Sequence, residues 1–461
     1  MRLSLTVTAA EQLLEEAFGM QLQCNLLPHN DGRCGWYDLL PPPPAATPLR
    51  GKVEADWVVL GAGLAGLAAA RRLAELLPQQ RIALIDACRV GFGAAGRNSG
   101  FMIDLPHDLA SHSYTGVRDT DLRQIRLNRG AIDYMRSIVQ RFGIQCDWQE
   151  KGKLHGAVEP HGVHSLESFT AGLNALGEPY QELDHQAMKD ITGTNFYRSG
   201  LCTPGAILVQ PAALSRGLGT TLPENVQLYE ESPVRNIVLG PPHTLMTDQG
   251  QLRAPKMVLA NNAYATQFSQ LGLKGKILPI YTYGSLTRPL TPHEQDALGG
   301  EESWGLVPSD PMGTTVRRLS NGRICIRNSF TYNPSVSTSR HRLRRVSASH
   351  RRSFEKRFPM LPNVDFDYTW GGALCISRNG GTPFGQIQPG VFSAVCQNGL
   401  GLTRGTISGK LIAEYALGVE SELLSDMLQQ PKPIANPPEP LLGIGIRSTL
   451  AWKEWHAGIE L

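Results

Sequence analysis

A strand, a glycine turn and a helix follow one another at residues 56–66, and this arrangement constrains the fold more than any other feature. The apolar run Val58–Leu60 suits a central parallel strand, and the turn Gly61–Gly66 that follows reads G-A-G-L-A-G. In such a turn the first glycine permits a tight bend, the second lets a pyrophosphate approach the backbone, and the third lets the helix lie close to its strand. The pattern predicts a dinucleotide site at a helix N-terminus.

An acidic residue completes this unit. The apolar run Ile82–Ile85 predicts the next strand, and Asp86 follows it, about 20 residues beyond the turn. A carboxylate in this place accepts hydrogen bonds from both hydroxyls of an adenosine ribose, and it disfavours a ribose that carries a 2′-phosphate. The segment therefore predicts a βαβ unit of a Rossmann-like α/β domain.

Length, composition and charge exclude several classes of protein. The chain has 461 residues, 41% hydrophobic and 18% charged, which is typical of a globular α/β enzyme with two or three domains. A net charge of +3 is too small to indicate a nucleic-acid partner. The basic cluster at 340–352 has helical spacing beside Val346 and Phe354, so it predicts a solvated helix face.

The cysteines and the N-terminus indicate where the protein resides. Eight cysteines are scattered without metal-ligand spacing, which favours reduced thiols, a cytoplasmic location and no metal site. Glu11, Glu15 and Glu16 interrupt any signal-peptide core, and no apolar run approaches the length of a transmembrane helix. We expect a cytoplasmic protein without a transmembrane segment.

The order of predicted elements divides the chain. Residues 1 to about 23 have the pattern of an amphipathic helix, and a proline-rich spacer at 41–44 ends an N-terminal extension over residues 1–50. A discontinuous nucleotide domain is expected at 51–105, 200–275 and 365–425, with strands at 226–229, 234–239 and 256–259 returning to its sheet. Residues 106–199 and 276–364 predict a substrate domain with a mixed, largely antiparallel sheet, and residues 426–461 a C-terminal tail.

Two further glycine-rich loops follow the first turn. The loop at 91–100 is too irregular for a helix or a strand, and such loops let backbone amides touch a flat ligand. The turn Asn398–Gly401 leads into a predicted helix at 406–417, whose N-terminus suits an electron-rich ligand edge. Both loops are candidates for contact with the same ligand.

Four ordered motifs extend this interpretation beyond the nucleotide turn. Gly96–Phe101 reads G-R-N-S-G-F, Pro279–Tyr283 reads P-I-Y-T-Y, Thr287–Leu290 reads T-R-P-L, and Trp370–Gly385 begins W-G-G. Together with the proline-rich lead-in they resemble the FAD-dependent amine and amino-acid oxidases of the D-amino-acid oxidase (glycine/sarcosine oxidase) superfamily. The chain looks most similar to the gamma-glutamylputrescine oxidase branch, and the resemblance covers about residues 36 to 425.

The resemblance implies an extended, noncovalently bound FAD. Val234 would contact the adenine through its backbone, and the alternative of a covalent bond to Cys375 is the less favoured one. The implied FAD contacts are Gly61, Gly63, Leu64, Ala65, Gly66, Asp86, Ala87, Gly96, Arg97, Asn98, Ser99, Val234, Asn261, Gly372, Asn398, Gly399, Leu400, Gly401 and Leu402.

Departures from the family pattern bear on the substrate. The motif G-H-S-G-H-G of the relatives is C-Q-N-G-L-G here, so both histidines are absent, while Arg288, Arg378 and Arg404 stand where the relatives have other residues. Arginine binds carboxylates through two parallel hydrogen bonds, so Arg378 and Arg404 are our candidates for a carboxylate clamp. The alternative is that each arginine pairs with an acid or lies outside the site.

Three further residues are candidates for the chemistry. The resemblance implies a lysine near the flavin that stabilises developing negative charge during oxygen reduction, and Lys276, or Lys274, is the candidate. His107 would act as a base towards the substrate amine. Tyr283, with Tyr281 two residues earlier on the same strand face, would cap the substrate. A surface lysine, a structural histidine and sheet packing are the respective alternatives.

We therefore expect an FAD-dependent oxidoreductase that converts the C–N bond of a small amino acid or N-substituted amino acid to an imine, with electrons passed to O2 or a carrier. A 2-hydroxy acid dehydrogenase and a polyamine-derivative oxidase on the same fold are alternatives, and a flavoprotein without turnover is a third. The sequence leaves the oligomeric state open.

Overall fold

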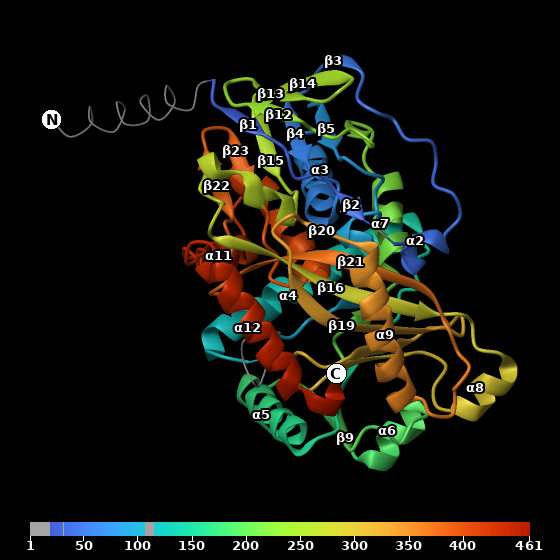
Figure 1. Ribbon diagram of the computed structural model, residues 1–461. Helices are drawn as coiled ribbons and strands as arrows, with labels where there is room; N and C mark the ends of the chain where they lie inside the picture. Colours follow the sequence, from blue (N-terminus) through green and yellow to red (C-terminus); the bar gives the residue numbers. More distant parts are fainter. Residues whose placement is uncertain (1–18, 31, 107–114) are drawn as a thin grey trace.

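The computed structural model describes residues 19–30, 32–106 and 115–461 and has an α/β architecture with two main sheets (Figure 1). Most of the helix predicted near the N-terminus falls outside these ranges. Its last residues were predicted wrongly, because Gln21–Gln23 form strand β1, in which Leu22 is buried and its two neighbours are exposed. That alternation favours a strand over a helix.

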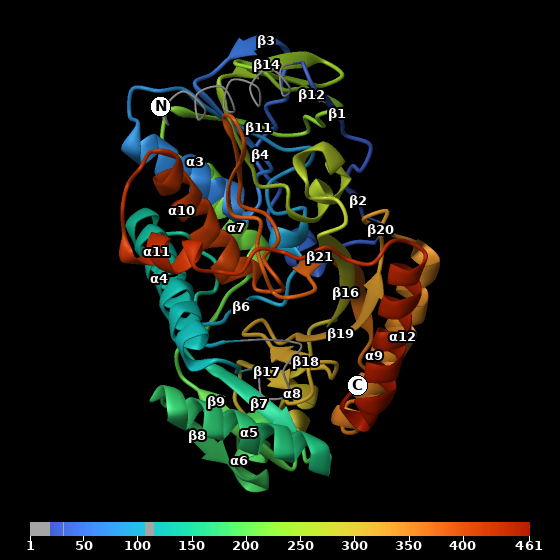
Figure 2. The same cartoon turned by 90° about the vertical axis from the view of Figure 1, so that its left-hand side faces the viewer.

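The first main sheet is the expected nucleotide-binding sheet. Parallel pairing joins five of its six strands, and the last strand is antiparallel. Helices α3 (Leu64–Leu76) and α10 (Thr406–Ala416) lie side by side over this sheet (Figure 2). The strands in spatial order are β11 (Val226–Tyr229), β5 (Ile82–Ile85), β4 (Trp57–Leu60), β15 (Lys256–Leu259), β23 (Val391–Ser393) and β22 (Gly385–Gln388).

A smaller five-stranded sheet lies beside it and corrects one prediction. The segment 234–239 was expected to return to the nucleotide sheet, but its strand β12 pairs with β1 and β13 instead. The reason is that β13, which is close in sequence and forms a hairpin with it, and the N-terminal strand β1 occupy its two edges. The order is β1 (Gln21–Gln23), β12 (Asn236–Val238), β13 (His243–Met246), β14 (Gly250–Ala254) and β3 (Gly51–Glu54).

The second main sheet has eight strands, and all but one of its pairings are antiparallel, as the predicted substrate-domain sheet requires. Two of its strands, β9 and β21, come from segments that the predicted boundaries place in the nucleotide domain. The order is β21 (Phe366–Ser377), β16 (Ile277–Thr287), β19 (Ile324–Tyr332), β18 (Thr315–Arg318), β17 (Trp304–Pro308), β7 (Lys153–Ala157), β9 (Ser199–Thr203) and β8 (Gln181–Leu183).

Two short strand pairs connect these layers. β6 (Phe101–Met102) pairs with β10 (Ile207–Leu208), and β2 (His29–Asn30) of the N-terminal segment pairs with β20 (Ser337–Thr338). The second pair joins the N-terminal segment to a loop that follows β19 of the eight-stranded sheet. The extension therefore runs from the smaller five-stranded sheet, through β1, to the segment that follows β19, through β2.

The helices predicted at 119–142, from 211 and at 406–417 are confirmed. The basic helix has one exposed face, as expected, and buries the other. Among the described residues, no helix is both long and apolar enough to cross a bilayer. Besides α3 and α10, the α-helices of the described residues are α2 (Gly35–Asp38), α4 (Arg118–Phe142), α5 (Pro160–Leu176), α6 (His185–Thr192), α7 (Pro211–Thr220), α8 (Pro292–Leu298), α9 (Arg340–Arg357), α11 (Glu422–Leu428) and α12 (Leu441–His456).

Candidate active site

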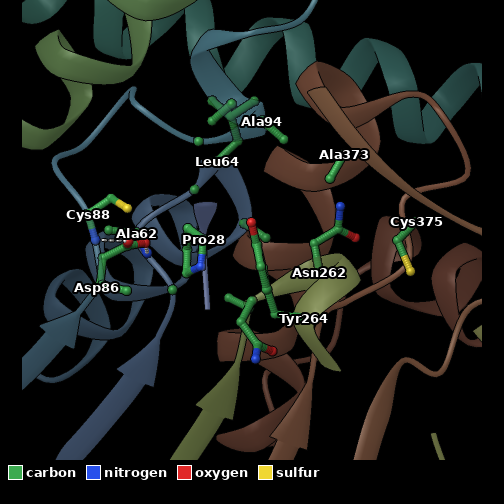
Figure 3. Close-up of a pocket in the computed structure, with 18 of the residues that line it drawn as sticks. Pro28, Ala62, Leu64, Asp86, Cys88, Ala94, Asn262, Tyr264, Ala373 and Cys375 are labelled. Atoms are coloured by element: carbon green, nitrogen blue, oxygen red, sulfur yellow. Dashed lines mark hydrogen bonds between the residues drawn. The ribbon is translucent and has the colours of Figure 1, made fainter. Parts of the chain in front are cut away.

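A long cavity opens at the carboxyl ends of the parallel strands, where open α/β sheets bind their ligands (Figure 3). Leu60 ends β4, Ile85 ends β5, and Ala260 follows β15, and all three residues line the cavity. Its volume, including the part open to solvent, is about 1380 Å³. Its lining extends from the first glycine turn and Asp86 to the second glycine loop and Gly401.

The first glycine turn has the geometry that its sequence predicts. Gly61 has a φ of +105°, which L side chains rarely adopt, and a Cβ on Gly66 would lie 1.7 Å from the Gly61 carbonyl oxygen. A Cβ on Gly63 would meet nothing within 4 Å, and Gly63 lines the cavity. Gly66 therefore serves packing, whereas Gly63 leaves space for a ligand beside the uncapped N-terminus of α3.

The second glycine loop repeats this geometry. Residues 91–96 read G-F-G-A-A-G, again G-x-G-x-x-G, and a Cβ on Gly96 would lie 1.9 Å from the Gly91 carbonyl oxygen. Gly91 has a φ of +82°, and Gly93 faces open space and lines the cavity. Gly91 and Gly93 are absent from the predicted contacts, although the second occurrence of the same pattern could have identified them.

Asp86 is fixed at the edge of the cavity by the backbone. Its Oδ2 accepts a hydrogen bond from the Ala62 amide at 2.7 Å, and its Oδ1 accepts one from the Cys88 amide at 2.8 Å. Figure 3 shows the carboxylate beside Ala62 with Cys88 on its other side. Burial raises the pKa of Asp86, and these two hydrogen bonds oppose that shift. Each carboxylate oxygen has a further lone pair, so the group can also accept from ribose hydroxyls.

The third turn is held in place by asparagine side chains. Asn398 has a φ of +49°, and its Oδ1 accepts from the Ser377 amide at 2.8 Å while its Nδ2 donates to the Gly380 carbonyl at 2.8 Å. The Oδ1 of Asn262 accepts from the Cys396 amide at 3.0 Å. Gly399 and Gly401, which follow, line the cavity. The asparagines thus shape the loop that brings these backbone amides to the ligand space.

The predicted FAD contacts divide into residues of the cavity surface and residues behind it. Those on the surface are Gly61, Gly63, Leu64, Ala65, Asp86, Ala87, Asn98, Val234, Asn261, Gly399 and Gly401. Those that do not line the cavity are Gly66, Gly96, Arg97, Ser99, Gly372, Asn398, Leu400 and Leu402.

Hydrogen bonds explain how the second group supports the wall. Arg97 is buried and donates from Nε to the Phe92 carbonyl at 2.8 Å and from Nη1 to the Gly371 carbonyl at 3.3 Å. The carbonyl of Ser99 accepts from Arg317 Nη1 at 3.1 Å. Both arginines therefore fix the second glycine loop from outside the cavity.

The N-terminal segment contributes a part of the cavity that the sequence did not predict. Cys24, Leu26, Leu27 and Pro28 line it, and Figure 3 shows Pro28 beside Ala62. The side chain of Gln267 holds this segment, accepting from the Leu26 amide at 2.9 Å and donating to the Leu26 carbonyl at 3.4 Å. No local pattern signals this arrangement, because the two residues are 241 positions apart.

Cys375 also lies on the cavity surface, on β21 beside Ala373 (Figure 3). It is buried, and burial, followed by the neighbouring Cys396 thiol, raises its pKa well above the ordinary range. A buried thiol that keeps its proton is a weak nucleophile. This environment accords with the prediction of a noncovalent cofactor.

The predicted catalytic residues are dispersed. Lys276 and Arg378 are exposed and do not line the cavity, and His107 lies outside the described residues. Arg404 belongs to the π-helical turn Gly401–Gly405, and its guanidinium donates to the side-chain oxygen of Gln124 on α4. Arg404 itself does not line the cavity, although Gly401 and Gly405, which precede and follow it in this turn, do.

Tyr281 and Tyr283 share one face of β16, as the strand period predicts, with ring centroids 6.3 Å apart. Both are fully buried, and their hydroxyls bond to the Val336 carbonyl at 2.8 Å and to Thr331 Oγ1 at 2.6 Å. These contacts are the sheet-packing alternative of the prediction. Neither tyrosine lines the cavity.

The residues present fit FAD. Each of the three turns has a cavity-lining glycine, Gly63, Gly93 or Gly401, whose Cβ would meet nothing within 4 Å, and Asp86 offers acceptors at the strand end. Residues 56–415 match the family of FAD dependent oxidoreductases. The chain belongs to this family. The expected cofactor and the expected enzyme class are therefore confirmed.

Individual relatives agree with this assignment. A probable oxidoreductase, OrdL, of Haemophilus influenzae is 27% identical over 82% of this chain and 86% of its own length. Gamma-glutamylputrescine oxidoreductase of Escherichia coli is 25% identical over 80% of this chain and 85% of its own length. The fold matches glycine oxidase from Geobacillus kaustophilus with a TM-score of 0.65 and 19% identity, over 80% of this chain and 96% of that one.

Proposed function

We propose that this FAD-dependent oxidoreductase oxidises the C–N bond of a small amino acid or an N-substituted amino acid to an imine. The flavin supplies the hydride acceptor when it is bound. The chain would supply the cradle: the turns at Gly61–Gly66 and Gly91–Gly96 would hold the pyrophosphate by their backbone amides, and Asp86, oriented by the Ala62 amide, would accept from the ribose. The turn ending at Gly401 would offer further amides to the flavin.

The position of Arg404 carries the proposal of a carboxylate-bearing substrate. Its neighbours Gly401 and Gly405 line the cavity, and its guanidinium contacts the neutral amide oxygen of Gln124. A guanidinium has five N–H donors in a fork that matches a carboxylate. Arg404 itself does not line the cavity, so contact with a substrate carboxylate would require its guanidinium to turn from Gln124 towards the cavity.

A second candidate substrate class is a polyamine derivative. The relative named gamma-glutamylputrescine oxidoreductase covers 80% of this chain, and this favours a cationic amine. A 2-hydroxy acid is the third class, because hydride removal next to a hydroxyl uses the same flavin chemistry. The three classes differ in charge and in product, so one assay separates them.

The decisive assay is anaerobic bleaching of the flavin absorbance of the purified holoenzyme. The panel contains small amino acids, N-alkyl amino acids, polyamines and 2-hydroxy acids. We expect bleaching by the first two groups, with release of ammonia or amine after the imine hydrolyses. Bleaching by polyamines alone would replace this proposal with the second class, and bleaching by hydroxy acids alone would replace it with the third.

Two arginine variants test the carboxylate contact. Arg404→Met is expected to raise KM for an acidic substrate by about a hundred-fold, since a lost charged hydrogen-bond pair costs roughly 2–3 kcal/mol. Arg288→Met is the matched control, because Arg288 forms an ion pair with Glu294 at 2.6 Å and neither neighbouring residue lines the cavity. An equal KM in Arg404→Met and the wild type would remove Arg404 from the site.

A further inference from the structure

The outer face of helix α12 carries an apolar stripe that no part of the described chain covers. Leu441 is 65% exposed, Ile444 58%, Trp452 57% and Trp455 77%. Their spacing of three, eight and three residues keeps them on one side of an α-helix. Ten large hydrophobic residues are exposed among the described positions, and six of them lie in this C-terminal region: Ile434, Leu441, Ile444, Trp452, Trp455 and Ile459.

The helix is firmly attached to the enzyme by its opposite face. Ile446 and Leu450 pack against Ile280 and Phe330 of the eight-stranded sheet. Beyond the helix, Glu460 is buried, and its Oε1 accepts from the Val158 amide at 3.0 Å. The stripe is therefore held on a rigid support and does not belong to a frayed end. An α-helix that is apolar on both faces is usually covered on both faces.

Positive charge lies directly beside the stripe. A groove between α9 and α12 is lined by Arg342 and Arg345 of α9 and by Arg447 of α12, with Glu454 as its acid, which accepts from the Phe330 amide at 3.3 Å. Figure 2 shows the two helices next to each other along one side of the molecule. The exposed basic residues of α9 are Arg340, His341, Arg342, Arg344, Arg345, Arg352 and Lys356, against the single acid Glu355.

We propose that the α12 stripe and the basic face of α9 together form a docking surface for an anionic lipid bilayer. Tryptophan is the side chain that prefers the membrane–water interface, because its ring is apolar and its N–H is polar. An apolar helix face that lies in the interface beside arginines that attract anionic headgroups is the usual arrangement of peripheral membrane binding.

The charge of this surface favours an anionic bilayer over a second copy of the chain as its partner. A two-fold contact through α12 would use the same surface on both copies, and it would place two basic α9 helices beside one interface. Like charges brought together in an interface cost several kcal/mol. An anionic bilayer satisfies both parts of the surface at once.

The test is sedimentation of the full-length holoenzyme with vesicles. The vesicles contain phosphatidylcholine alone or with about a third phosphatidylserine, at a salt concentration of about 0.15 M. We expect binding to the anionic vesicles, a blue shift of the tryptophan emission on binding, and weaker binding as salt is raised. Absence of wild-type binding to the anionic vesicles would overturn the proposal.

Three variants locate the surface. Trp452→Gln/Trp455→Gln is expected to weaken binding to anionic vesicles by about ten-fold or more, the effect of roughly 1.4 kcal/mol. Arg342→Gln/Arg345→Gln, which changes the two arginines of α9 that line the groove, is expected to lose most of the preference for phosphatidylserine. The matched control, Val117→Gln/Leu428→Gln, changes two exposed hydrophobic residues elsewhere and should bind as the wild type does.

Flavin content and the bleaching assay show that each variant is folded. Unchanged vesicle binding in the double tryptophan variant would overturn the proposal. So would a concentration-dependent dimer, seen by light scattering, that the same variant abolishes while no vesicle binding is found, because the stripe would then belong to a second copy.

Discussion

The glycine turns of the cavity and the arginines around it differ in what places them. The Gly61–Gly66 contact joins residues five positions apart, and the second turn repeats it at the same spacing. Arg317 instead bonds to a residue 218 positions away, and Arg404 to one 280 positions away. A turn is defined by local backbone geometry, whereas the direction of a long side chain depends on which distant segment packs against it.

This difference explains what the sequence could predict. The nucleotide strand, its turn and Asp86 were predicted with the roles that their geometry now supports, since each depends on a short segment. The second turn has the same glycine pattern, so it could be predicted in the same way. No sequence pattern predicts the cavity wall formed by Leu26 and Pro28, because this wall depends on Gln267 in another part of the chain.

For the polar side chains around the cavity, the sequence reveals the residue type but not the position. It identifies unusual arginines but not the direction in which each side chain points. Arg288 pairs with Glu294 and Arg378 is exposed, whereas Arg317, which supports the second loop, was not singled out. Residue type and spacing reveal a chemical group, but only long-range packing decides which surface it faces.

The largest effect on stability is expected for Gly66→Ala, a variant that distinguishes the packing role of Gly66 from the binding role of Gly63 in the first turn. Gly66→Ala would bring a Cβ within 1.7 Å of the Gly61 carbonyl oxygen, so α3 would have to move away from β4. We expect the apoprotein to lose on the order of 3 kcal/mol of unfolding free energy. The shift of the urea midpoint, measured without FAD, gives this value.

The matched variant is Gly63→Ala, which introduces its Cβ into open space. The apoprotein should lose about 1 kcal/mol or less, the cost of a poorer helix N-cap. The FAD dissociation constant should nevertheless rise by about ten-fold or more, because the methyl group occupies the pyrophosphate path. Equal apoprotein stability losses in the two variants would contradict the separate roles of these glycines.

A smaller effect on stability is expected for a buried histidine whose position depends on long-range packing. His350 of α9 is fully buried, its Nδ1 lies 2.7 Å from Ser285 Oγ, and burial lowers its pKa from 6.5 to about 3. Between these values the unfolded chain binds a proton that the folded chain does not bind. Stability therefore falls on acidification from about pH 6.5 towards pH 3, by about 1.4 kcal/mol for each pH unit.

The variant His350→Gln removes this contribution, so its stability should fall less steeply with acid than that of the wild type. Urea unfolding at a series of pH values between about 6 and 4 measures the two slopes. His164→Gln, on the exposed face of α5, is the control and should follow the wild type. Parallel curves for His350→Gln and the wild type would show that this histidine is protonated in the folded state.

The smallest effect is expected at the exposed ion pair. Arg288 lies 2.6 Å from Glu294, and hydrogen bonding from this guanidinium is the main cause that lowers the pKa of Glu294 to about 2. Both groups contact solvent, so Arg288→Met should lower the unfolding free energy by less than about 1 kcal/mol, and the difference should shrink at high salt. A salt-independent loss of several kcal/mol would instead place Arg288 among the side chains that long-range packing makes essential, and the distinction between the locally encoded turns and the surrounding arginines would have to include it.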